Sequence, residues 1–108
     1  MKIKLSPRLL DSQLTAIVSG DRITLNGDTL DFSPLGNGEL LPLSAINNEW
    51  VASDVARIDG EICITLVCPH SQTAPYETRF PDAFERPMIV VDGKVQIPPY
   101  ESRKSEES

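Results

Sequence analysis

The 108-residue sequence is poor in the side chains that most often carry chemistry, with two cysteines and one histidine. Two cysteines do not make a disulfide framework. Cys63 and Cys68 lie an odd number of residues apart in one predicted strand, so they point to opposite faces and cannot bridge there. Zinc sites usually take four ligands in paired spacings, whereas Cys68-Pro69-His70 has no second pair. We therefore expect free thiols, no metal site and no cofactor.

Catalytic patterns are scarce as well. Nucleophilic catalysis needs a base beside its nucleophile, and any such site would have to form around His70, the single histidine. Cys68 is two residues away, but the predicted register turns it toward the core. The glycines of Asn26-Gly27, Asp59-Gly60 and Asp92-Gly93 are explained by hairpin turns, which need positive φ. We predict that the protein is not an enzyme.

Basic residues and long apolar runs are also few. Ten Lys and Arg are outnumbered by sixteen Asp and Glu, which gives a formal net charge of −6. Nucleic-acid backbones and anionic membranes attract basic patches, so we expect neither as a partner. No run approaches the ~18 apolar residues of a spanning helix, and MKIKLSPRLL has no signal-peptide core. These features predict synthesis in a cytoplasm.

The length fits one domain, since domains most often contain about 100–150 residues. We predict a single β domain over residues 1–100. Residues 101–108, ESRKSEES, contain no apolar side chain. A charged, serine-rich segment cannot bury enough apolar surface to order itself, so we predict a disordered tail there.

The strongest pattern runs from Trp50 to Pro69, where two apolar-rich stretches flank Asp59-Gly60. This dipeptide favours a two-residue hairpin turn. Pairing Ile58 with Glu61 across the turn places six side chains on one face, as a buried sheet surface requires: Val51, Val55, Ile62, Ile64, Leu66 and Cys68. The same register sets Val51 opposite Cys68. We expect this hairpin to lie in the middle of a sheet.

A second pattern, residues 13–32, predicts a three-stranded meander with tight turns at Gly20-Asp21 and Asn26-Gly27. The two turns agree on one apolar face, made of Leu14, Ala16, Val18, Ile23, Leu25, Leu30 and Phe32. On the opposite face they pair Thr24 with Thr29 and Arg22 with Asp31, which are favourable cross-strand contacts. We expect the meander to pack against the core face of the first hairpin.

The rest of the chain adds smaller elements. Ile3 and Leu5 alternate with lysines in a strand that we expect to end at Ser6-Pro7, and Ser44 can cap one helical turn. Asp92-Gly93 predicts a third hairpin that pairs Val90 with Val95 and buries Met88, Val90, Val95 and Ile97. The predicted fold is mainly β: a small antiparallel sandwich or partly open barrel built from three hairpins, with at most one short helix.

The segment from Pro69 to Pro87 differs from the rest, because it contains four prolines and three of the six aromatic residues. Aromatic side chains on a proline-stiffened loop anchor interfaces at small entropic cost. We therefore predict partner contacts through Tyr76, Arg79, Phe80 and Phe84. The alternative stays open that Phe80 and Phe84 fold back to cap the open end of the β core.

Several stretches resemble a family of small uncharacterised proteins of tailed bacteriophages and prophages, encoded near tail genes. They are LDFSPLGNGELLP, EWVASDVARIDGEICITLVCPH, residues 74–81 and VDGKVQIPPYE, and the resemblance covers residues 20–101. It brings no catalytic or binding residues. It implies a minor structural component of the tail or virion, or a tail-assembly accessory, that contacts other tail proteins or a second copy of itself. The alternative is an intracellular accessory domain that binds a host protein or a small ligand.

Overall fold

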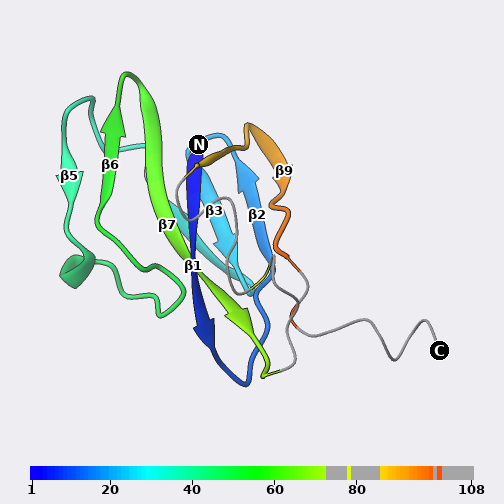
Figure 1. Ribbon diagram of the computed structural model, residues 1–108. Coiled ribbons are helices and arrows are strands. Elements are labelled where there is room, and N and C mark those ends of the chain that lie inside the picture. The colour runs from blue at the N-terminus through cyan, green and yellow to red at the C-terminus, as the bar shows by residue number, and fades with distance from the viewer. Residues whose placement is uncertain (73–77, 79–85, 99, 101–108) are drawn as a thin grey trace.

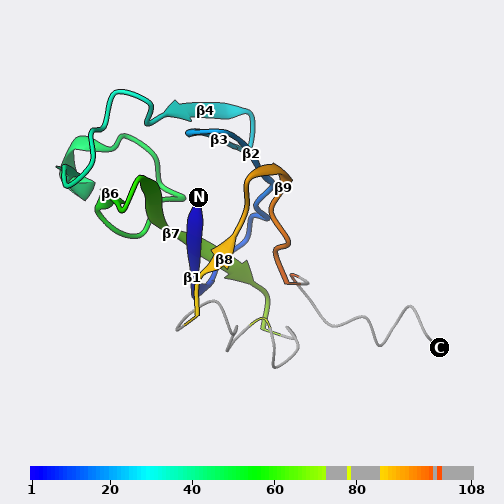
Figure 2. The same cartoon turned by 90° about the horizontal axis from the view of Figure 1, so that it is seen from above.

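The structure is a computed structural model that describes residues 1–72, 78, 86–98 and 100. Its strands are β1 (Lys2–Leu9), β2 (Ala16–Ser19), β3 (Arg22–Leu25), β4 (Asp28–Asp31), β5 (Leu40–Leu41), β6 (Val55–Ile58), β7 (Glu61–His70), β8 (Met88–Ile89) and β9 (Asp92–Lys94). They form two sheets, with orders β5-β6-β7-β1-β8 and β4-β3-β2-β9 (Figures 1 and 2). The prediction of a small mainly β sandwich or open barrel is confirmed. The predicted tail, residues 101–108, lies outside the described residues.

The meander β2–β3–β4 has the predicted register. Ala16 pairs with Leu25, and Arg22 pairs with Asp31. The Thr24 and Thr29 hydroxyls are 2.8 Å apart, and the Arg22 Nε lies 3.4 Å from an Asp31 carboxylate oxygen. The tight turns form because Gly20, Asn26 and Gly27 adopt positive φ, which two-residue hairpin turns require.

The hairpin β6–β7 also forms as predicted near its turn, where Arg57 pairs with Ile62. Farther out the register changes, and Val51 bridges to Leu66 instead of the predicted Cys68. Between the pairs Ala56–Cys63 and Val51–Leu66, the four residues 52–55 lie opposite only two residues, 64 and 65. The chain that leads into β6 therefore contains a bulge of two residues. Since the shift is two residues, Val51 stays on the core face. Its inward position is confirmed, while the predicted partner is wrong.

Strand β1 continues through Pro7 to Leu9, so the predicted end at Ser6-Pro7 is wrong. Its whole length pairs with β7 in parallel, a departure from the predicted antiparallel arrangement. Leu10 N donates to the His70 carbonyl oxygen at 3.2 Å. Amides two residues apart point the same way in a strand, so the Pro7 nitrogen faces away from β7. The missing N–H therefore costs no ladder hydrogen bond.

The predicted third hairpin does not form. Instead, β8 joins β1, with Met88 opposite Ile3, and β9 joins β2, with Gly93 opposite Val18. Figure 2 shows the chain passing from one sheet to the other between β8 and β9. Strand β8 forms hydrogen bonds with the edge of β1, and β9 forms them with the edge of β2. If β8 and β9 paired only with each other, both of these sheet edges would stay unpaired. The predicted inward side chains are still right, since Val95 is buried and Met88, Val90 and Ile97 pack partly buried on the core.

The two sheets enclose one apolar core. Its buried members are Met1, Ile3, Leu5, Leu14, Ala16, Val18, Ile23, Leu25, Phe32, Trp50, Val51, Val55, Ile62, Ile64, Leu66, Val67, Cys68 and Val95. Meander and hairpin thus pack face to face as predicted, and β7 lies in the middle of its sheet. One 3-10 turn, η1 (Leu43–Ala45), has no side-chain cap, so Ser44 does not cap it. Within the described ranges, no helix has the length and apolar character needed to cross a membrane.

Candidate functional site

The predicted contact residues Tyr76, Arg79, Phe80 and Phe84 lie outside the described residues. Within their loop, the structure describes Thr78, which is fully buried. Its carbonyl oxygen accepts a long hydrogen bond from the Cys68 thiol, with 3.9 Å between sulfur and oxygen. The loop therefore contacts the core at Thr78, and the roles of its aromatic side chains stay predictions.

The Cys68-Pro69-His70 cluster is arranged for packing. Cys68 is fully buried on the inner face of β7, and burial raises the pKa of its thiol to about 11. The nucleophilic form of cysteine is the thiolate, and very little thiolate exists at neutral pH with such a pKa. His70 places Nδ1 2.9 Å from the Ser71 carbonyl oxygen. Cys63 and Cys68 are both free.

The buried Cys68 thiol should make folding stability fall at alkaline pH. In the unfolded chain the thiol has its ordinary pKa of 9.0, and in the folded chain about 11. Between these values the unfolded state releases a proton that the folded state keeps, so stability decreases with pH. We expect the contribution to be complete below about pH 9 and to be lost as the pH rises through about 11, a change of ~3 kcal/mol in all. Urea unfolding across this range measures it.

Two variants isolate this effect from the lysines and tyrosines that titrate in the same range. In Cys68→Ala, the free energy of unfolding should no longer show this decrease between about pH 9 and pH 11, whatever the stability of the variant at neutral pH. Cys63→Ala, which removes the half-buried thiol of the same strand, should keep it. Equal alkaline slopes in wild type and Cys68→Ala would contradict the assignment.

The outer face of the five-stranded sheet carries a row of mostly apolar side chains, which we name the outer-face row. Its members are in register across all five strands: Leu40, Ala56, Cys63, Lys2 and Ile89. Leu40 and Ile89, on the two edge strands, are 57% and 66% exposed, and Ile58, two residues beyond Ala56, is 53% exposed. Exposed apolar side chains that share one face often mark a contact surface.

The outer-face row occupies only one end of this sheet. Toward the other end of β7, the side chains of Val67 and Pro69 alternate onto the same outer face, yet both are buried. Both faces of β7 are thus covered there, while Cys63 and Thr65 are half-buried. Among the described residues on the outer face of this sheet, the large exposed apolar side chains therefore lie at the end that carries the row.

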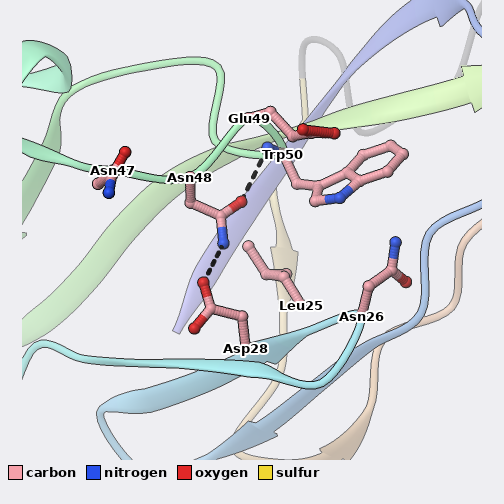
Figure 3. Close-up of a pocket in the computed structure, with 7 residues that line it drawn as sticks. All are labelled: Leu25, Asn26, Asp28, Asn47, Asn48, Glu49 and Trp50. Atoms are coloured by element: carbon pink, nitrogen blue, oxygen red, sulfur yellow. Dashed lines mark hydrogen bonds between the residues drawn. The ribbon is translucent and has the colours of Figure 1, made fainter.

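A second feature is a cleft of about 410 Å³ between the β3–β4 turn and the segment that leads to β6. Its lining consists of Leu25, Asn26, Asp28, Asn47, Asn48, Glu49 and Trp50 (Figure 3). Asn26 begins the type I′ turn with φ 48°. Its side-chain oxygen accepts from Thr15 N at 2.7 Å, and its side-chain nitrogen donates to the Gln13 carbonyl oxygen at 3.0 Å. Asn26 is thus part of the frame of the cleft.

Asn48 connects the two walls of the cleft. Its side-chain nitrogen donates to an Asp28 carboxylate oxygen at 3.0 Å, and its side-chain oxygen accepts from Trp50 N at 2.8 Å. The second bond is an Asx turn, which asparagine forms readily two residues along the chain. Figure 3 shows Asn48 between the Trp50 backbone and Asp28. The cleft is therefore held in shape by its own side chains.

This cleft was not predicted from the sequence. Trp50 was predicted as the start of a hairpin, and no binding role was assigned to Asn47 or Asn48. The available signal was a pair of asparagines beside an acidic residue and the single tryptophan of the chain. That signal is weak, because the contact with Asp28 spans twenty residues and depends on the meander packing beside this segment.

No protein-family model, curated protein or solved structure matches this chain. Among the residues that the structure describes, no three His, Cys, Asp or Glu side chains lie close enough to hold a metal ion. The candidate sites are thus two surfaces suited to binding: the outer-face row and the cleft beside Trp50.

Proposed function

We propose that this chain is a non-enzymatic protein of a tailed bacteriophage or prophage, a minor tail component or a tail-assembly accessory. It is made in the host cytoplasm and acts through contacts with other tail proteins or with a second copy of itself. The stretches of sequence that resemble phage proteins encoded near tail genes support this proposal. The resemblance is one of sequence alone.

The observation that carries the proposal is the outer-face row. Leu40 and Ile89 are large apolar side chains at the two edges of one sheet face, and more than half of each is exposed. Covering such side chains removes apolar surface from water at ~25 cal/mol per Å². Lys2 lies within the row, between Cys63 and Ile89. A partner that places apolar side chains over the row, with a carboxylate opposite Lys2, would satisfy both features.

The aromatic loop is a second contact that we propose on sequence grounds. Tyr76, Arg79, Phe80 and Phe84 combine three aromatic rings with a guanidinium, the side-chain types enriched where binding energy concentrates. Replacing Tyr76 and Phe84 by serine separates this role from a core-capping one. Loss of binding with intact folding supports a contact, and loss of folding supports a cap.

Mass spectrometry of purified virions tests the proposal. Particles are induced from cells that carry the gene, with wild type or with the double variant Leu40→Ser, Ile89→Ser. We expect wild type in the particle and a reduction of about tenfold or more for the double variant, because losing two buried apolar anchors costs more than ~1.4 kcal/mol. Absence of wild type from particles, together with normal tail assembly in a deletion strain, would overturn the proposal.

Ile17→Ser is the matched control for the double variant. Ile17 is 46% exposed, but it lies on the outer face of the other sheet, opposite Thr24. It should enter particles like wild type. Circular dichroism of each purified variant checks that the fold is kept, so that a loss of incorporation reports on the surface.

A further inference from the structure

We infer that the outer face of the five-stranded sheet binds an acidic surface of another protein. The inference rests on the proposed function in one respect, that this face is a contact surface, and it does not require the partner to be a tail protein. Three observations carry it: a line of cationic side chains along β1, the lack of carboxylates to neutralise them on the same face, and the exposed apolar side chains beside them.

The cationic side chains lie on alternate residues of β1. Ile3 and Leu5 are buried, so the alternation of side chains along a strand turns Lys2, Lys4 and Arg8 to the outer face. We name these three residues the basic strip. Lys4 and Arg8 are exposed, and Lys2 is half-buried. A strand rises ~3.3 Å per residue, so the basic strip extends for ~20 Å along the sheet.

The described carboxylates leave the basic strip without an ion-pair partner. Among the outward positions of the five strands, the acidic residue is Glu61, whose carboxylate lies 3.2 Å from the Met1 nitrogen. The ion pairs within the described part of the chain are formed elsewhere, and none involves a side chain of the strip. On β7, the residues in register with Lys4 and Arg8 are neutral. The charges of the strip are therefore available to a partner.

The basic strip contrasts in sign with the chain that carries it. It holds three of the ten Lys and Arg of a protein whose formal net charge is −6. Positive charge gathered on one face of an acidic protein directs a negatively charged partner to that face and fixes its orientation. Carboxylates that meet the strip gain Coulomb attraction at ion-pair distance. The charge distribution thus selects an acidic partner.

The apolar side chains beside the strip favour a protein over a nucleic acid. Ile89 is in register with Lys2 and is 66% exposed, and Leu40 on the other edge strand is 57% exposed. A phosphate backbone has no apolar groups to cover them. The outward positions of the five described strands include no aromatic side chain on which a base could stack. The matching surface therefore combines carboxylates with apolar side chains.

Peptide binding to the purified full chain tests the inference. The probe is a fluorescein-labelled peptide of about twelve alternating glutamate and leucine residues, and fluorescence anisotropy measures its binding. We expect saturable binding in the micromolar to millimolar range. The affinity should fall about fivefold or more between ~0.05 and ~0.5 M NaCl, because salt screens exposed charges. A control peptide with glutamine in place of glutamate should bind about tenfold more weakly. No saturable binding of the acidic peptide, or equal binding of the two peptides, would overturn the inference.

Two charge reversals locate the binding. Lys4→Glu and Arg8→Glu should each weaken binding of the acidic peptide by about fivefold, because each replaces an attraction by a repulsion at the surface. Lys94→Glu is the matched control, since it makes the same change of net charge at an exposed position of β9 in the other sheet. It should bind like wild type. Equal weakening in all three variants would show that only net charge matters and would contradict the site.

Two other occupants give different results with the same protein. A labelled DNA duplex of ~20 base pairs that binds more tightly than the acidic peptide would overturn the inference in favour of a nucleic acid. Sedimentation velocity of the protein alone tests for a second copy. An oligomer that forms in wild type and is lost in Lys4→Glu would overturn the inference in favour of self-association.

The virion experiment separates a failure of this inference from a failure of the proposed function. We expect Lys4→Glu and Arg8→Glu to reduce incorporation into particles by about fivefold, as they reduce peptide binding, and Lys94→Glu to leave it unchanged. If Leu40→Ser, Ile89→Ser reduces incorporation but the strip variants do not, the contact surface stands and the acidic partner is wrong. If wild type is absent from particles, the tail role is wrong, and the peptide titration still decides whether the face binds an acidic surface.

Discussion

Replacing Arg57 by alanine should lower the free energy of unfolding by ~3 kcal/mol. Its side chain is 13% exposed and joins the two sheets. Nη2 donates to an Asp21 carboxylate oxygen at 2.9 Å and to the Phe32 carbonyl oxygen at 3.2 Å, and Nη1 donates to the Gly60 carbonyl oxygen at 3.1 Å. Nε donates to the Leu35 carbonyl oxygen. One guanidinium thus fixes the β2–β3 turn, the end of β4 and the β6–β7 turn together.

Urea unfolding of Arg57→Ala measures this loss, and Arg22→Ala is the matched control. Arg22 also faces an aspartate across a strand pair, but its side chain is 63% exposed and that of Asp31 is 42% exposed. Solvent-exposed pairs of this kind contribute ~0–1 kcal/mol, so the control should stay close to wild type. Equal decreases in the free energy of unfolding for Arg57→Ala and Arg22→Ala would contradict the prediction that Arg57 stabilises the fold by joining the two sheets.

Replacing Leu66 by alanine should cost ~3–4 kcal/mol, within the range for buried leucines. Leu66 is fully buried in the central strand β7. In register it faces Leu5 of β1, and it also bridges to Val51. Leu5 is held in β1, and Val51 is itself buried in the core, so both can close only part of the cavity that the lost methyl groups leave.

Ile58→Ala provides the comparison for Leu66→Ala, and thermal or urea unfolding measures both. Ile58 lies in a strand of the same sheet but is 53% exposed. It should lose less than ~1 kcal/mol, mainly through the lower strand preference of alanine. A loss for Leu66→Ala no larger than that for Ile58→Ala would show that β7 is not the packing centre of the domain.

The parts of the fold that the sequence predicts correctly are those with local signals. Asn26 and Asp59 have φ values of 48° and 51°, and each is followed by glycine at the second turn position. Two adjacent residues therefore decide where each hairpin turns. The alternation of apolar residues then decides which face is buried. This is why the meander and the end of β6–β7 near its turn could be predicted residue by residue.

The parts that could not be predicted depend on distant partners. Lys2 pairs with Cys63, and nothing within either strand indicates this parallel neighbour. Asp92-Gly93 has the composition of a hairpin turn, yet Gly93 lies within β9 at φ 111° because β2 and β1 each offer an open edge. The hydrogen bonds that β8 and β9 form with the two existing sheets therefore stabilise the chain more than a local hairpin turn at Asp92-Gly93 would.

The candidate sites follow the same division. The outward positions of Ala56 and Cys63 follow from strand alternation, but the alignment of Leu40 with Ile89 requires the order of all five strands. The cleft needs Asn48 to reach Asp28 across the two walls. Such contacts arise only after the sheets have packed, so neither binding surface could be assembled from the sequence.

The parallel pairing of β1 with β7 also has a consequence for how the chain matures on the ribosome. Strand β1 is translated about fifty residues before β7, an interval of several seconds at ~5–20 residues per second. Within the meander, β2, β3 and β4 can pair with one another before β7 is made, whereas β1, which contains Ile3 and Leu5, still lacks its partner strand. Lys2 and Lys4 alternate with them, and charged residues beside an apolar strand discourage premature association. We expect these two lysines to reduce association of the nascent chain until β7 has been made.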